Sequence, residues 1–109
     1  MNMSTTATIK IKDADVAVYV HWNGYDLTKL CDEICIALKN NYSDVRVEND
    51  PVYGMMRVVD TIIKTEGYDG LNYGLITSDW TEDYNYVIYS DGDNITWSCK
   101  ELNDKEIDD

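Results

Sequence analysis

Two short apolar segments open the chain. In residues 7–12 isoleucines alternate with threonine and lysines, which is typical of a half-exposed strand. Residues 16–22 form a β-branched and aromatic run with its valines on one face. Turn-forming residues, Asp13 among them, separate the two segments. The pattern predicts an N-terminal β-hairpin that ends at Asn23 and Gly24.

Two segments in the middle of the chain have the period of amphipathic helices. In residues 26–40 apolar side chains recur every three or four positions, and Asp26 is a favourable N-cap. A second helix is predicted to begin at Asp50 and Pro51, because Asp caps a helix and Pro suits its first turn. It is predicted to end before Gly67. Its predicted apolar face consists of Val52, Met55, Met56, Val59, Ile62 and Ile63.

The remaining segments are loops and strands. Residues 42–49 fit a short edge strand or a loop about equally well. Residues 68–81 are rich in Gly, Asn, Asp and Ser, and they predict a loop that holds one short strand at most. Residues 84–90 and 95–101 predict two strands, and the turn-forming residues 91–94 join them into a C-terminal hairpin.

This order of elements predicts an α+β fold. We expect an antiparallel sheet of four or five strands, built from the two hairpins, with both helices packed on one face. A chain of 109 residues supports a single domain, residues 1–109, with an ordinary core. Residues 102–109 are expected to form a frayed acidic tail.

The location of the protein and the state of its cysteines follow from the same patterns. The sequence has no apolar run of transmembrane length and no signal peptide, so a cytoplasmic protein is expected. The three cysteines lack the spacing of a disulfide framework. Cys31 and Cys35 share the apolar face of the first helix, so reduced, buried thiols are expected. Metal or redox chemistry at these cysteines is the less favoured alternative, and no metal or cofactor is predicted.

The net charge restricts the class of partner. The chain holds 21 acids against 9 Lys and Arg, a formal charge of −12. This charge argues against direct binding to nucleic acid and to anionic membranes. Residues 1–78 carry a net −4 and residues 79–109 a net −8, so most of the excess lies in the last third. An acidic surface can serve solubility alone, or it can be complementary to a basic partner.

The aromatic residues sharpen that second interpretation. The chain has nine Tyr, three Trp and no Phe. Tyr and Trp combine an apolar body with a polar tip and are enriched at protein interfaces. In the last third they alternate with acids, and we predict a partner-binding surface there. Its residues are Asp79, Trp80, Glu82, Asp83, Tyr84, Tyr86, Tyr89, Asp91, Asp93 and Glu101. The alternative is that one face of the hairpin is core and the other is an ordinary solvated sheet.

Candidate catalytic chemistry is sparse. His21 is the only histidine, and no nucleophile motif and no phosphate-binding glycine loop accompanies it. We therefore expect a protein that is not an enzyme. A small-ligand site is the alternative hypothesis, because helix N-termini attract anions. Its residues would be His21, Trp22, Tyr25 and Asp26, although the negative charge of the chain weighs against an anionic ligand.

Residues 4–25 resemble a loose group of small phage- and prophage-borne proteins. Those proteins open with an S-T-R-A-x-I-x-I strand and continue into an H-x-D-G-Y-P turn and a helix. This chain has Thr6 where the group has Arg, Asn23 where it has Asp, and Asp26 where it has Pro. The group has no activity to carry over. The resemblance implies a setting in the host cytoplasm, where small acidic phage proteins often inhibit host enzymes or defence systems by occluding a basic site.

Three hypotheses follow for the function. The leading one is a phage-type accessory protein that inhibits a host defence or nucleic-acid-processing protein by occupying a basic site as a nucleic-acid mimic. Its partner would be a basic host protein or nucleoprotein complex. The second is a nucleotide-type ligand-binding or sequestering oligomer, and the third is a structural or assembly protein. An exposed sheet edge also leaves a homodimer open.

Overall fold

The computed structural model describes residues 5–21, 26–41, 46–67, 73–77 and 81–102. Along this part of the chain the elements are β1 (Ala7–Ile11), β2 (Val16–Val20), α1 (Thr28–Asn41), the 3₁₀ turn η1 (Val47–Asn49), α2 (Pro51–Glu66), β3 (Tyr73–Thr77), β4 (Tyr84–Asp91) and β5 (Asn94–Glu101). The predicted α+β class, with two helices packed against a sheet of five strands, is confirmed.

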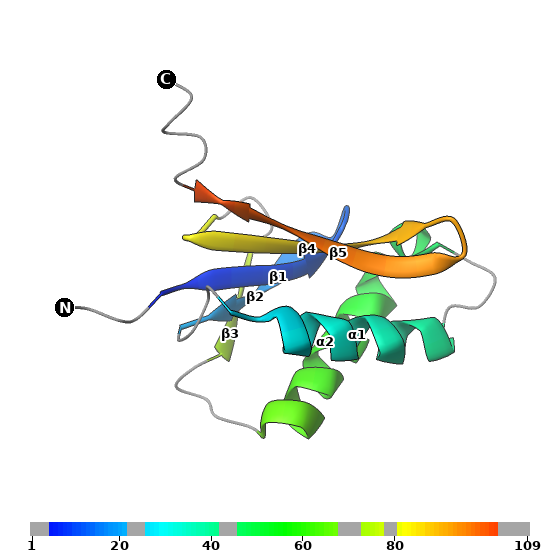
Figure 1. Ribbon diagram of the computed structural model, residues 1–109, viewed down its shortest axis with the longest axis horizontal. Helices are drawn as coiled ribbons and strands as arrows, with labels where there is room; N and C mark the ends of the chain where they lie inside the picture. The colour runs from blue at the N-terminus through cyan, green and yellow to red at the C-terminus, as the bar shows by residue number, and fades with distance from the viewer. Residues whose placement is uncertain (1–4, 22–25, 42–45, 68–72, 78–80, 103–109) are drawn as a thin grey trace.

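The five strands form one sheet in the order β3-β2-β1-β4-β5 (Figure 1). Three of the four neighbouring pairs are antiparallel, and two of these three, β1–β2 and β4–β5, are the predicted hairpins. The exception is β1 with β4, which are parallel, with Ala7 opposite Tyr84. Each of these two strands is the first of its hairpin, and the hairpins lie side by side in the same direction. The sheet is therefore mixed, and β3 and β5 are its edges.

Both helices lie on one face of this sheet, and the core fills the space between (Figure 1). Ile9 and Ile11 of β1 are fully buried in the same core cluster as Ile34 and Leu38 of α1 and Val58 of α2. No helix in the described part of the chain is long and apolar enough to cross a membrane.

The two cysteines of α1 belong to this core. Cys31 and Cys35 are buried, whereas Cys99 of β5 is exposed, and all three are free thiols. Burial raises the pKa of the Cys31 thiol and, to about 11, that of the Cys35 thiol. Both groups therefore stay protonated at neutral pH and pack as small apolar side chains, as predicted.

The structure revises two details of the helices. α1 begins at Thr28, two residues after the predicted N-cap Asp26. α2 has the predicted bounds, but part of its predicted apolar face is wrong. The helix is turned so that Met55, Val58 and Ile62 meet the core, and Val52, Met56 and Ile63 remain 72%, 67% and 43% exposed.

Candidate functional site

The register of the strands brings distant residues together at one end of the sheet. Val20 lies opposite Ala7, Ala7 opposite Tyr84, and Tyr84 opposite Glu101. The residues that flank these positions therefore meet there as well. Among them are Thr6, His21, Glu82 and Asp83. We call Glu82, Asp83 and Glu101 the acidic end of the sheet.

Hydrogen bonds hold the loop before β4 in a defined shape. Thr6 donates from Oγ1 to Glu82 Oε1 at 2.7 Å and from its backbone N to Asp83 Oδ2 at 3.4 Å. The Glu82 backbone N donates to Asn85 Oδ1 at 3.0 Å, and Asn85 Nδ2 donates back to the Glu82 carbonyl at 2.8 Å. The Leu102 backbone N donates to the Asp83 carbonyl at 2.9 Å. The carboxylates are thus presented from a closed loop that is attached to both β1 and β5.

The acidic end combines exposed negative charge with aromatic neighbours. Asp83 and Glu101 are exposed. Burial, reinforced by the charges of Glu82 and Asp83, raises the pKa of Tyr19 on the adjoining part of β2. Only two ion pairs form among the described residues, Arg46 with Glu48 and Lys64 with Asp60, and neither involves Asp83 or Glu101. The Asp83 carboxylate accepts hydrogen bonds from Thr6, and both carboxylates remain exposed.

The predicted acids Asp91 and Asp93 lie at the other end of the hairpin. The eight residues of β4 separate the two groups by roughly 23 Å. Gly92, with a φ of 62°, opens the tight turn in which Asp91 pairs with Asn94. Lys39 Nζ of α1 donates to the Asp93 carbonyl and to Asn94 Oδ1, both at 3.0 Å. A cation thus lies beside this turn, and the hairpin acids form two groups instead of one continuous surface.

Tyr86, predicted as a partner contact, is a core residue. It is 3% exposed, and its ring packs against Trp97 with the centroids 5.7 Å apart. Its hydroxyl accepts a hydrogen bond from the backbone N of Leu27 at 3.4 Å, just before α1. Burial raises its pKa. The ring lies between the sheet and the helices and is not accessible to a partner, so Tyr86 is removed from the predicted surface.

The other aromatic residues of the hairpin are divided between its two faces. Strand alternation places Tyr84 on the helix-covered face with Tyr86, and Tyr89 on the open face. Both are only partly exposed. Trp97 is half-buried and donates from Nε1 to Asp32 Oδ1 of α1 at 2.8 Å. β4 and β5 therefore match the alternative interpretation, in which one face of the hairpin is core and the other face is solvated. Asp79 and Trp80 lie outside the described residues.

Of the alternative ligand site, the structure describes only His21 and Asp26, and these two residues form no pocket. His21 Nδ1 lies 3.3 Å from the hydroxyl of Tyr19, and Asp26 is exposed ahead of α1. Trp22 and Tyr25 lie outside the described residues. Two pockets among the described residues, one beside β3 and one between the helices, do not include His21 or Asp26. Within the same residues no three acidic, His or Cys side chains cluster as metal ligands would.

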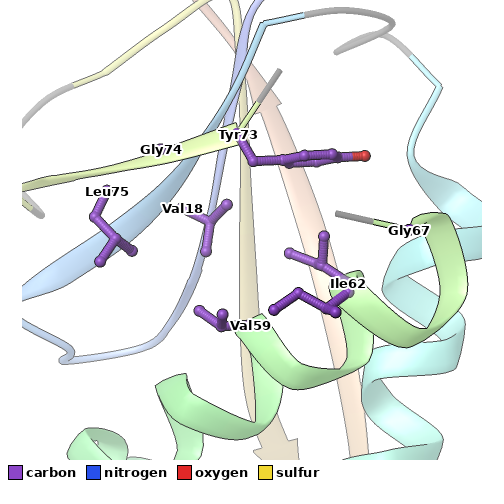
Figure 2. Close-up of a pocket in the computed structure, with 8 residues that line it drawn as sticks. Val18, Val59, Ile62, Gly67, Tyr73, Gly74 and Leu75 are labelled. Carbon is purple, nitrogen blue, oxygen red and sulfur yellow. The ribbon is translucent and has the colours of Figure 1, made fainter. Parts of the chain in front are cut away.

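An apolar groove that was not predicted from the sequence lies at the opposite edge of the sheet. It lies between α2 and strands β2 and β3 and has a volume of about 280 Å³ (Figure 2). Figure 2 shows Val59 and Ile62 pointing up from α2 toward Val18 and Leu75 of the strands. The apolar stripe of α2 is unusually wide in the sequence, and one face of the sheet cannot cover it completely. This width was the sequence feature that could have indicated the groove.

No family model matches the chain, and neither a curated protein nor a solved structure matches it. Function is therefore inferred from the surfaces of this chain itself.

Proposed function

We propose that the protein acts by binding, and that the acidic end of the sheet contacts a basic surface on a partner protein. In this proposal it is a phage-type accessory protein that inhibits a host defence or nucleic-acid-processing protein by occupying its basic site. The observation that carries the proposal is the convergence of Glu82, Asp83 and Glu101 from two separate parts of the chain.

Two further features support the proposal. The loop that carries Glu82 and Asp83 is closed by the Asn85 bonds, so little conformational entropy is lost when a partner orders it. The sequence continues the charge on both sides of the acidic end, with Asp79 before it and Asp104, Glu106, Asp108 and Asp109 after it. Such a field steers a basic partner during encounter and gives an association that weakens as salt is added.

A capture experiment tests the proposal. The tagged protein is incubated with lysate of the cell that produces it, and captured proteins are identified at about 0.05 M and about 0.3 M salt. We expect a basic, nucleic-acid-binding protein that is retained at low salt and lost at high salt. An acidic-end triple variant, Glu82→Gln, Asp83→Asn and Glu101→Gln, should lose it even at low salt.

The matched control removes the same number of charges elsewhere. Asp15→Asn, Glu33→Gln and Glu66→Gln are substitutions at exposed positions of a turn and of the two helices. The control triple should retain the partner. Equal capture by both triples contradicts the proposed site, and capture that resists about 0.3 M salt contradicts its electrostatic basis. Displacement of the captured protein by added nucleic acid tests the mimicry directly.

A further inference from the structure

The apolar groove beside β3 has the size and lining of a site for a small molecule. Its volume of about 280 Å³ lies near the lower limit of the pockets that hold small ligands in proteins. Val18 and Ile62 of its lining are almost fully buried, whereas Ile63 and Leu75 are 43% and 65% exposed. Among the described residues that line it, none carries a charge. The body of a molecule that fits this groove is therefore apolar.

The end of the groove where α2 stops is negative. Glu66, the last residue of α2, follows Ile63 by three residues and Val59 by seven, so it lies on the side of the helix that lines the groove. It is exposed, and neither of the two ion pairs among the described residues involves it. The last turn of a helix also carries the negative end of the helix dipole. A carboxylate and a helix carboxyl terminus thus lie together at this end.

The lysine of the same helix turn is directed elsewhere. Lys64 Nζ lies 3.0 Å from Asp60 Oδ2, one turn earlier in α2. Both residues line the pocket between α1 and α2, which is on another side of the helix from the groove. The positive charge of Lys64 is therefore paired with Asp60 and is not placed on Glu66.

Tyr73 adds an aromatic face at the same end. Figure 2 shows its ring extending from β3 across the groove, on the side of Gly67, the residue that follows α2. The face of a tyrosine ring attracts a cation, most strongly where water is displaced. An apolar groove that ends at an aromatic ring, a carboxylate and a helix carboxyl terminus suits an apolar molecule with one positive charge.

We propose that the groove binds a small amphipathic cation, an organic amine with an apolar chain or ring. The apolar body lies between α2 and the strands β2 and β3, and the ammonium group lies at the end of α2, near Glu66 and Tyr73. This ligand site is additional to the proposed contact with a basic partner, which uses the acidic end of the sheet.

The charge of the whole chain favours a cation over a neutral or anionic occupant. A net charge of −12 raises the local concentration of cations and repels anions. The sequence also places an acid on either side of β3, Asp69 before the strand and Asp79 after it. The same charge opposes the insertion of a second copy of this chain.

Three probes that share one alkyl chain test the chemistry. Octylamine, octanol and octanoate are titrated into the full chain at neutral pH by isothermal titration calorimetry. Octylamine should bind with a dissociation constant below about 1 mM, octanol at least about threefold more weakly, and octanoate most weakly. No binding of octylamine up to about 3 mM, or equal affinities for octylamine and octanoate, overturns the proposal.

A charge-removing variant locates the ammonium group. Glu66→Gln should weaken the binding of octylamine at least about threefold and leave the binding of octanol unchanged. Glu33→Gln is the matched control, because it removes the same charge from an exposed position of α1. It should leave both affinities unchanged. Equal effects of the two variants overturn the placement of the ammonium group at the end of α2.

A charge-adding variant locates the apolar body. Leu75→Lys places a competing ammonium group at the groove and should weaken the binding of octylamine at least about tenfold. Ile36→Lys is the control, because Ile36 is 59% exposed on α1, outside the groove. Both substituted side chains are exposed, so both variants should fold, which circular dichroism verifies. If Leu75→Lys binds octylamine like the wild type, or if both variants lose it equally, the assignment to the groove is overturned.

The amine site is independent of the proposed partner site. The acidic-end triple variant should bind octylamine almost as tightly as the wild type, and Leu75→Lys should still capture the basic partner. Loss of octylamine binding in the triple variant, with full binding in Glu66→Gln, would place the amine at the acidic end and overturn the inference. Each proposal can thus fail without the other.

Discussion

The two edges of the sheet are built differently. β5 ends in Ser98, Lys100 and Glu101, which are exposed polar or charged residues, and α1 packs beneath it through Trp97. β3 has no charged residue, and α2 leaves an apolar groove beside it. Charged positions favour contact with solvent and with charged partners, whereas an apolar groove favours the body of a small ligand. The same sheet therefore has one edge suited to solvent and polar partners and one suited to an apolar ligand.

Packing follows the same division. The β4–β5 side is attached to the rest of the molecule by Tyr86 in the core and by polar bonds from α1 and η1. The β3 side has exposed apolar side chains, Leu75 among them. We therefore expect substitutions on the β4–β5 side to change the stability of the fold, and substitutions on β3 to change the binding of a ligand in the groove.

The largest expected effect is at Tyr86. Tyr86→Ala removes a buried ring and should lower the free energy of unfolding by about 3–5 kcal/mol. Leu75→Ala, at the exposed position of β3, should change that free energy by less than about 0.5 kcal/mol. Urea unfolding measures both. Comparable losses would remove the distinction between the two sides.

A smaller effect is expected where η1 meets β4. Ser90 is 6% exposed, and its Oγ accepts a hydrogen bond from the backbone N of Val47 at 2.9 Å. Ser90→Ala leaves that buried N–H without its acceptor and should cost about 1–3 kcal/mol. Ser98→Ala, at an exposed position of β5, is the matched control and should be close to neutral. Urea unfolding measures both variants. If Ser90→Ala costs as little free energy of unfolding as Ser98→Ala, the hydrogen bond between η1 and β4 does not stabilise the fold.

Glu48 should make this junction sensitive to acid. Burial opposes its ionisation, but hydrogen bonds from the backbone N–H groups of Ser90 and Glu48 itself and the Arg46 guanidinium outweigh burial and hold its pKa below the ordinary value. Because the folded-state pKa of Glu48 is lowered, its ionised carboxylate stabilises the fold fully at pH values above the ordinary Glu pKa of about 4.5. This contribution disappears as the pH falls through the folded-state pKa.

The test compares Glu48→Gln with the wild type from neutral pH to about pH 3. The variant should be less stable by about 1–2 kcal/mol at neutral pH, and the difference should shrink in acid. Glu66→Gln, at an exposed position, should show no such convergence. A constant difference for Glu48→Gln across the range would mean that its charge does not stabilise the junction.

The smallest effect concerns reactivity alone. Cys99 is exposed, whereas burial raises the pKa of the Cys31 and Cys35 thiols and removes them from solvent. A thiol reagent should label one cysteine per native chain and all three after unfolding. Cys99→Ser should abolish the native labelling without loss of stability. Rapid labelling of three thiols in the native protein would contradict the packing of α1.

The sequence predicts elements better than the surfaces between them. Asp50, Pro51 and Gly67 correctly bound α2, and Gly92 marks the turn of the C-terminal hairpin, because these are local preferences of the backbone. The sequence predicted a loop at residues 68–81 with one short strand at most. It could not predict β3 more firmly, because the pairing of β3 with β2 is a long-range contact. Strand alternation separates two faces but does not say which one the helices cover, so the predicted surface included tyrosines of both faces, and Tyr86 is buried.

The candidate surfaces depend even more on tertiary structure. Glu82 and Glu101 are far apart in the chain, and only the register of β4 and β5 brings their ends together. The division of the acids into two groups follows from the length of β4, which composition does not reveal. The apolar groove combines residues of β2, α2 and β3, and the helical period alone predicted α2 to bury Val52, Met56 and Ile63.

Amide NMR shifts recorded as octylamine is added test the contrast between the edges most directly. Amides beside the groove, from Ile63 to Gly67 and from Tyr73 to Leu75, should shift and saturate together, because the ligand occupies one site. Amides of β5, Asn94 to Glu101, should keep their shifts, because β5 lies four strands away from β3. Shifts at β5 as large as those at the groove, or no shifts at the groove up to about 3 mM octylamine, would contradict the assignment of ligand binding to the β3 edge.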